Sequence, residues 1–346
     1  MNTQPIDAIA KAVLYEGYML YPYRPSSVKN RQRFNFGVLY PRSYSEAQTG
    51  SDAWSLQTEC LVEGDSLSTV EVRVRFLKLV SRSVRPLTPA QPTEAAKAGA
   101  PWQEAVECEV NLPVYKLQEL VEAPREREFS FPAKEEVEEL RNGNGSIGGM
   151  IARNQEAILG VVELKAVPAA ECIFKVQVRV KNLTEFDMST ANNGRDGALI
   201  RSLVSAHVVL GVTDGQFISL LEPPENLREV AESCQNVGVW PVLVRAEGAR
   251  DTMLASPIIL YDYPQIAPES PGDLFDGTEI DEILALRILT MTEEEKEEMR
   301  NTDERARKML ERTENLPMEQ LAKLHGTLRE LRPALSSFDS SREEMP

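Results

Sequence analysis

The chain is poor in histidine and cysteine, the residues on which many protein metal sites depend. Its 346 residues include only two histidines, His207 and His325, and four cysteines. Two histidines leave little material for a histidine-rich metal site or a Ser-His-Asp triad. We expect His207, which lies within an apolar strand pattern, to be a core histidine. The cysteines form no C-x-x-C pair, so the chain does not resemble a metal carrier; they are Cys60, Cys108, Cys172 and Cys234. We therefore predict no cofactor.

Long apolar runs are also missing. No stretch of about 18 apolar residues occurs, so we expect no membrane span. Residues 1–20 lack a basic region followed by an apolar core, so we expect no secretory signal peptide. The scattered cysteines suit free thiols in a reducing compartment better than a disulfide framework. These features together predict a cytoplasmic protein.

A net positive charge occurs at one end of an otherwise acidic chain. The formal net charge is -16, which argues against broad affinity for nucleic acid, because its backbone repels an acidic surface. Residues 1–42 nevertheless hold six basic and two acidic residues, whereas residues 269–346 hold 11 basic and 20 acidic residues. The charge asymmetry therefore runs from one end of the sequence to the other.

Alternating apolar and polar residues dominate the first 270 residues. In the stretch 70–76, the residues Val70, Val72, Val74 and Phe76 alternate with charged residues, which predicts a half-buried strand. Turn signals at Gly64–Asp65 and at Asp214–Gly215 predict two hairpins. We expect a mainly β (α+β) fold with one or two antiparallel β-sandwich-like modules.

The pattern changes near residue 277, after which the sequence is helical in character. Thr292 with Glu295, and Thr278 with Asp281, match the capping box that starts helices. We predict a strand-rich module over 1–125, a second β-sandwich-like module over 126–276, and an acidic helical region over 277–346.

The first candidate site is an aromatic and basic segment, residues 14–41, which contains five of the nine tyrosines. Rings bury much area at low entropic cost, and guanidinium groups stack on them or bind carboxylates, so the segment suits a partner-binding surface. The alternatives are that the rings fill a core while the arginines pair with the chain's own acidic helices, or that the segment stacks on nucleic acid bases. The predicted partner-binding residues are Tyr18, Tyr21, Tyr23, Arg24, Arg31 and Arg33.

The second candidate site is an acidic, proline-containing stretch over residues 261–282. Clustered carboxylates bind hard cations or act as acid and base, although the spacing does not match a calcium loop. A solvated loop that leads into a helix is the simpler interpretation, because acids favour helix starts. The residues of the metal or enzyme alternative are Asp262, Glu269, Asp273 and Asp276.

Three long segments, residues 14–41, 256–296 and 311–331, together resemble an uncharacterised bacterial family whose genes lie among those for uptake nickel-iron hydrogenases and their accessory proteins. Residues 204–225 match more loosely. The resemblance implies an accessory or assembly role with such a hydrogenase. It supplies no catalytic residues.

The leading hypothesis is a non-enzymatic cytoplasmic accessory protein that binds a protein partner, either a hydrogenase subunit or another accessory protein. It predicts that replacing Arg24, Arg31 and Arg33 by Ala weakens partner capture without disturbing the fold. The first alternative is a carboxylate-dependent enzyme that uses the stretch 261–282. The second is a structural protein whose basic end packs on its own acidic helices.

Overall fold

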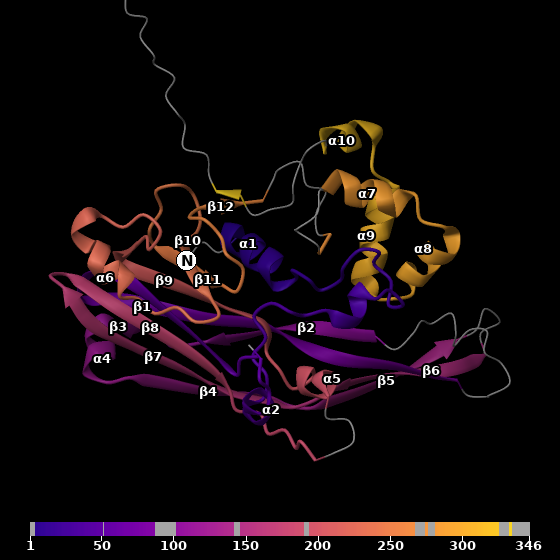
Figure 1. The fold of residues 1–346 in the computed structure, drawn as a ribbon, viewed down its shortest axis with the longest axis horizontal. Coiled ribbons are helices and arrows are strands. Elements are labelled where there is room, and N and C mark those ends of the chain that lie inside the picture. Colours follow the sequence, from indigo (N-terminus) through magenta and orange to yellow (C-terminus); the bar gives the residue numbers. More distant parts are fainter. Residues whose placement is uncertain are drawn as a thin grey trace, which may run out of the picture.

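One large antiparallel sheet of 11 strands forms the body of the molecule (Figure 1), which establishes the mainly β class. The computed structural model describes residues 4–50, 52–86, 102–141, 146–189, 194–266, 274–275, 281–324 and 332–333. The strands of the large sheet are β1 (Ser55–Pro86), β2 (Trp102–Asn111), β3 (Tyr115–Lys116), β4 (Arg125–Phe131), β5 (Lys134–Arg141), β6 (Ile147–Gln155), β7 (Ile158–Ala170), β8 (Ile173–Asn182), β9 (Val204–Ile218), β10 (Trp240–Leu243) and β11 (Thr252–Ser256). A separate pair joins β12 (Pro264–Gln265) to β13 (Arg332–Pro333).

Strand β1 is 32 residues long and is the central strand of this sheet, with which five other strands pair. The main hydrogen-bonded path runs β10-β11-β9-β1-β8-β7-β4, while β2, β3 and β6 also pair with β1, and β5 pairs with β6. Since β1 belongs to the first predicted module and β8 and β9 to the second, the boundary predicted after residue 125 falls within a single sheet.

Both predicted hairpins are wrong, because β1 and β9 continue through their turn signals. Gly64 lies opposite Gly215, and pairing resumes at Thr69 after a bulge. Within the bulge, the Asp65 carboxylate accepts the backbone N–H groups of Leu67 (2.7 Å) and Ser68 (2.9 Å). The Ser68 hydroxyl then donates to the Asp214 carbonyl at 2.5 Å. Two turn-like sequences that lie face to face thus make a shared irregularity instead of two turns.

The predicted alternation along β1 is confirmed, since Val70, Val72, Val74 and Phe76 are all fully buried. The sheet curls so that β4 faces the middle of β1. The Phe76 ring lies 6.0 Å from the Phe129 ring and 5.5 Å from the Phe131 ring, between centroids. This curled arrangement encloses the main hydrophobic core.

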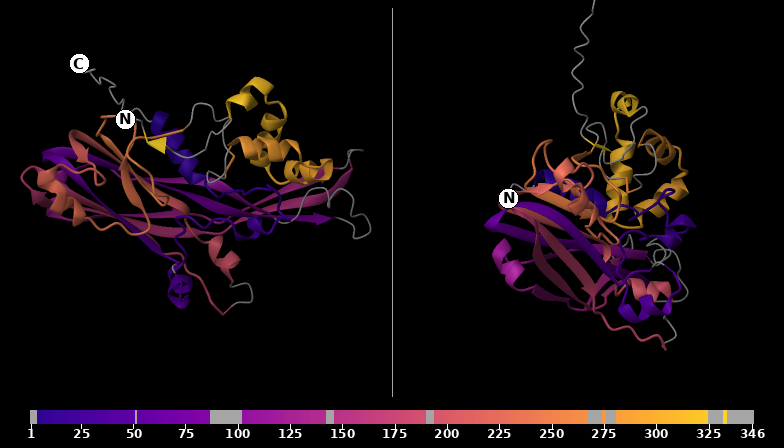
Figure 2. Two further views of the ribbon diagram at one scale, coloured as in Figure 1. Left: turned by 45° about the horizontal axis from the view of Figure 1, so that its top comes forward. Right: turned by 60° about the vertical axis from the view of Figure 1, so that its left-hand side comes forward.

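Helices cover the opposite face of β1 and β2 (Figures 1 and 2). A second core joins Leu77 and Leu79 of β1 to helical residues such as Leu284 and Leu310.

The capping box of Thr292 and Glu295 is confirmed, whereas Thr278 lies outside the described residues. The helices are α1 (Gln4–Leu14), α2 (Arg42–Ala47), α4 (Leu117–Glu122), α5 (Arg195–Leu199), α6 (Arg228–Glu232), α7 (Asp281–Leu289), α8 (Glu293–Arg300), α9 (Glu304–Glu314) and α10 (Met318–Lys323), with short 3-10 turns at Lys29–Gln32 and Glu225–Leu227. Among the described helices, none has the length and apolar character needed to cross a membrane.

Candidate functional site

The aromatic–basic segment, residues 14–41, lies largely inside the molecule. Tyr18 is 1% exposed, Tyr23 is fully buried, and Arg33 is 5% exposed. The prediction that these side chains form an accessible contact surface is therefore wrong. The rings are buried because the segment passes between the sheet and the C-terminal helices, where it supplies much of the second core.

Arg33 holds this segment to the sheet. Its guanidinium donates to the carbonyls of Tyr18 (2.8 Å) and Gln103 (2.9 Å). The same group stacks on Trp102, with Cζ 3.3 Å from the ring centroid. Burial lowers the pKa of Arg33 to about 10, so the side chain stays charged at neutral pH. A planar donor fork and an aromatic stacking partner explain why arginine suits this interior position.

Asp303, at the start of α9, ties the segment to the C-terminal helices. Its carboxylate accepts the hydroxyl of Tyr18 at 2.7 Å and the indole N–H of Trp102 at 3.2 Å. It also caps α9 by accepting the backbone N–H of Ala306 at 2.8 Å. Burial raises the pKa of Tyr18 well above its ordinary value, and the charge of Asp303 adds to the effect. Tyr18 is therefore a neutral donor at physiological pH.

The remaining predicted site residues also meet the acidic helices. Arg24 forms an ion pair with Glu295 of α8 at 2.9 Å. Tyr21 is half-buried, and its ring lies 4.8 Å from Cζ of Arg287 on α7. The side chain of Arg31 lies outside the described residues. These contacts are the arrangement that the structural alternative expects, with the basic end packed on the chain's own acidic helices.

Sequence reasoning missed three residues that organise this region: Trp102, Asp303 and Asn30. Asn30 is buried and bridges the turn, since its side chain accepts from the N–H of Leu20 (2.8 Å) and donates to the carbonyl of Arg24 (3.1 Å). Asp303 precedes an amphipathic run, which is a usable signal for its capping role. Its hydrogen bonds to Tyr18 and Trp102 join residues more than 200 positions apart in the sequence, so no local pattern predicts them.

The acidic stretch has only one of its four predicted residues within the described part of the chain. The carboxylate of Asp262 accepts the backbone N–H of Leu243 at 2.7 Å and the hydroxyl of Ser219 at 2.5 Å, so it fixes two loops. Glu269, Asp273 and Asp276 lie outside the described residues, and the enzyme alternative stays a hypothesis. Within the described ranges, no three or more His, Cys, Asp and Glu side chains are grouped to bind a metal.

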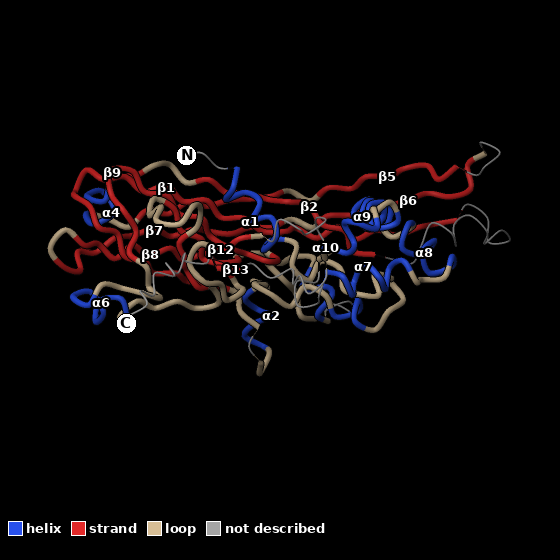
Figure 3. The backbone as a smooth tube through the Cα atoms, turned by 90° about the horizontal axis from the view of Figure 1, so that it is seen from above, coloured by secondary structure: helices blue, strands red, loops and turns tan. Residues whose placement is uncertain are grey.

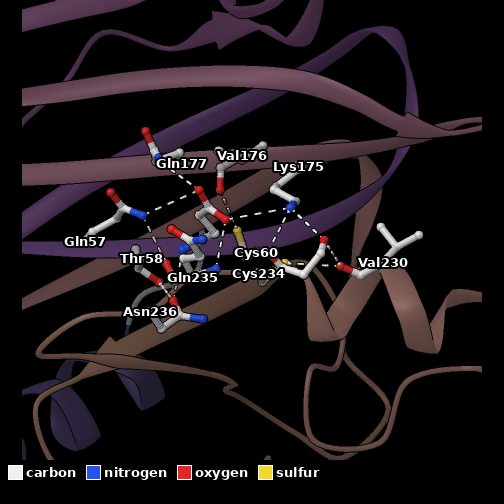
Figure 4. Close-up of polar contacts among 12 residues, drawn as sticks. Gln57, Thr58, Cys60, Lys175, Val176, Gln177, Val230, Cys234, Gln235 and Asn236 are labelled. Atoms are coloured by element: carbon white, nitrogen blue, oxygen red, sulfur yellow. Dashed lines mark hydrogen bonds and ion pairs between the residues drawn. The ribbon is translucent and has the colours of Figure 1, made fainter.

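A polar cluster centred on Glu59 joins β1 and β8 to the loop after α6 (Figure 4). The Glu59 carboxylate accepts the backbone N–H of Gln235 (2.8 Å) and the side-chain amide of Gln177 (2.5 Å). The Asn236 side-chain carbonyl accepts the Thr58 hydroxyl at 2.8 Å and the backbone N–H of Glu59 at 2.9 Å. These groups satisfy one another, which is typical of a structural anchor.

Two cysteines lie in the same region. Burial raises the pKa of Cys234 to about 11 and that of Cys60 further above its ordinary value. Both thiols are therefore protonated at neutral pH and poor nucleophiles. All four cysteines of the chain are free.

His207 is completely buried on β9. Its neighbours on the same strand face, Ser205 and Val209, contact α1, which covers this part of the sheet. Nδ1 of His207 lies 2.9 Å from the Ser205 carbonyl. Burial lowers the pKa of His207 to about 4, and the charge of Arg75 adds to the effect. The imidazole is thus neutral at physiological pH and forms part of the core, as the sequence predicts.

The most exposed strand of the large sheet's described part belongs to the β5–β6 hairpin, residues 134–155. Seven of the eight β5 residues are exposed, including Val137, which is 55% exposed. Ile147, where β6 begins, is 41% exposed. The hairpin runs toward one end of the elongated molecule (Figures 1 and 3). Its side chains are acidic around an apolar residue, and they are available for contact with another molecule.

Comparisons with known proteins leave the family resemblance as a prediction. No protein-family model matches this chain, and a search of curated proteins finds no match.

Proposed function

We propose that this protein is a non-enzymatic accessory protein that acts by binding another protein, with nickel-iron hydrogenase assembly as its setting. The observation that carries the binding role is the β5–β6 hairpin. The described side chains of the aromatic–basic segment mostly stabilise the chain's own fold, whereas β5 is exposed at seven of its eight positions. Another protein can therefore reach these seven side chains without a change in this fold.

The hairpin has a defined chemical character. Four of its residues are glutamates: Glu135 and Glu139 lie on the same strand face as Val137, and Glu136 and Glu138 lie on the other face. Such a surface favours a partner with basic groups around an apolar position, because opposite charges steer encounter and apolar contact adds affinity.

The hydrogenase setting and the cytoplasmic location have separate supports. The first is supported by the family resemblance of residues 14–41, 256–296 and 311–331. The second is supported by four free thiols, which persist in a reducing compartment. Both belong to the proposal.

The test is affinity purification of the tagged full chain from a native host, followed by mass spectrometry. Two charge-reversal variants are compared with the wild type: Glu135→Lys with Glu139→Lys on the hairpin, and Glu293→Lys with Glu294→Lys on α8 as the matched control. All four residues are exposed, so the folds should remain intact.

We expect a hydrogenase subunit or accessory protein to co-purify with the wild type and the α8 control. The hairpin variant should capture at least about tenfold less, since reversing interfacial charge costs on the order of a few kcal/mol. Equal capture by the hairpin variant would remove the hairpin as the contact surface. Capture of proteins unrelated to hydrogenases would remove the hydrogenase setting.

A further inference from the structure

The curled sheet has a gap between two of its edges, β2 and β4. In the described part of the chain, β2 pairs only with β1, and β4 pairs only with β7. The two unpaired edges converge on a cavity of about 360 Å³. Three consecutive residues of β2, 109–111, and five of β4, 127–131, line it. We call this feature the β2–β4 seam.

The strand register shows which backbone groups of β2 point into the seam. The N–H of Leu112 donates to the carbonyl of Val72 on β1, and successive residues of an antiparallel strand direct their backbone groups to opposite sides. Val110 therefore directs its N–H and C=O toward β1. Glu109 and Asn111 direct theirs toward the seam.

The register of β4 against its neighbour β7 likewise shows which backbone groups of β4 point into the seam. Leu159 of β7 accepts the N–H of Leu183, so its backbone groups face β8, and those of Gly160 face β4. Phe129, which lies opposite Gly160, consequently directs its backbone groups to β7. Glu128 and Ser130 direct theirs into the seam. Donors and acceptors thus enter the cavity from both sides with the spacing of β-strands.

Side chains at the seam differ between the inner and outer surfaces. Val110 is buried in the main core, and Phe129 and Phe131 pack against that core. On the outer surface, Glu109 and Glu128 are exposed, one on each side of the seam. An extended segment placed here would meet apolar groups and Arg127 on its inner side. On its outer side it would meet Glu128 and Glu109, whose carboxylate also lies 3.7 Å from Arg75.

We propose that the β2–β4 seam accepts an extended peptide segment of a partner protein by strand addition. The segment alternates basic side chains, which face Glu109 and Glu128, with small apolar side chains, which face Val110 and Phe129. Strand addition is favoured because only an extended backbone satisfies two facing rows of unpaired backbone groups at once. The inference rests on the proposed function, in that the segment belongs to the bound partner, and it assigns a second contact distinct from the β5–β6 hairpin.

The experiment measures amide hydrogen exchange of the full chain with two synthetic probes. The first probe is the acetylated and amidated peptide Lys-Val-Lys-Val-Lys, and the second is Glu-Val-Glu-Val-Glu. The first should slow exchange in the segments that contain residues 109–111 and 128–130, whereas the second should not.

Two variants at one position sharpen the test. Ser130→Pro removes a seam-facing N–H without breaking a bond to β7, and proline is tolerated at such edge positions. Ser130→Ala keeps the N–H and is the matched control. Ser130→Pro should weaken binding of the lysine–valine peptide about tenfold, as expected for loss of a backbone hydrogen bond and of strand geometry. Ser130→Ala should bind like the wild type, and circular dichroism checks that both variants fold.

In the exchange experiment, three results would overturn the proposal: equal protection of the seam by both peptides, protection of β5 instead of the seam, or no protection at millimolar peptide. Folded Ser130→Pro that binds the lysine–valine peptide as tightly as the wild type would contradict it. Seam protection that rises with protein concentration in the absence of peptide would also overturn it, because a second copy of the chain would then fill the seam. This test is independent of the hairpin test. If the peptide does not bind the seam but the wild type still captures its partner, the seam proposal fails and the proposed function is retained.

Discussion

The aromatic–basic segment and the β5–β6 hairpin use charge in opposite ways. In the segment, Arg33 is buried against Trp102, and the carboxylate of Asp303 lies nearby to balance its charge. In the hairpin, the charged side chains of β5 remain in solvent around an exposed Val137. The charged side chains of β5 pair with neighbours inside the hairpin, as Glu138 does with Arg153 of β6, and they remain exposed to a partner.

Replacing Arg33 by Ala should have the largest effect. The change leaves the carbonyls of Tyr18 and Gln103 without a donor and opens a void beside Trp102. We expect a loss of about 4 kcal/mol in the free energy of unfolding, measured in urea. Arg42→Ala, at an exposed arginine, should cost less than about 1 kcal/mol. Similar costs for the two variants would mean that Arg33 is not an interior residue. A large cost for Arg33→Ala would contradict the sequence-based expectation that Arg24, Arg31 and Arg33 can be replaced without disturbing the fold.

Acid should weaken the packing of α1 on β9 through His207. The pKa of His207 is about 4 in the folded protein and about 6.5 in the unfolded chain. The unfolded chain therefore binds the extra proton first, so this contribution is complete above pH 6.5 and is lost as the pH falls toward 4. The shift corresponds to about 3 kcal/mol.

The check is urea unfolding between pH 5 and pH 7 for the wild type and His207→Leu. The charge of Arg75 on β1 acts on the imidazole, and Arg75 lies 3.8 Å from the carboxylate of Asp7 on α1; both proteins keep these groups. The variant should show a shallower dependence of unfolding free energy on pH. Identical slopes would show that His207 is solvated in the native state.

Asp303→Ala should have an intermediate effect. It removes the acceptor for Tyr18 and Trp102 together with the cap of α9. We expect a loss of about 2 kcal/mol in the free energy of unfolding, since a helix cap and a partly buried acceptor are lost together. Glu304→Ala, at the adjacent exposed position, is the control and should cost far less. Equal costs would indicate that the segment and α9 are not coupled through Asp303.

The hairpin variant, Glu135→Lys with Glu139→Lys, should have the smallest effect on stability. Exposed side chains away from caps and cores change the free energy of unfolding by no more than about 0.5 kcal/mol. Thermal unfolding monitored by circular dichroism measures the change. A loss as large as that of Asp303→Ala would mean that the hairpin belongs to the structural framework.

The sequence predicts much of the fold but little of the site. Strict alternation at Val70, Val72 and Val74 identifies the central strand, because a half-buried strand needs an apolar side chain at every second position. Gly64 and Asp214 wrongly predict hairpin turns, because β-bulges and turns favour the same residue types. The two structures differ in whether a neighbouring strand pairs with the segment, and the local sequence does not show this. The burial of Arg33 depends on Trp102 and Asp303, which are distant in the sequence, so the local pattern cannot distinguish an interior arginine from a surface one.

Hydroxyl-radical footprinting of the native protein measures whether the aromatic–basic segment is buried and the β5–β6 hairpin is exposed. The internal reference is Tyr261, which is 65% exposed. We predict that Tyr261 and Val137 are modified readily in the native protein, and that Tyr18 and Tyr23 are modified only after unfolding. Modification of Tyr18 and Tyr23 in the native chain as fast as that of Tyr261 would contradict the account, because the aromatic–basic segment would then be the accessible surface.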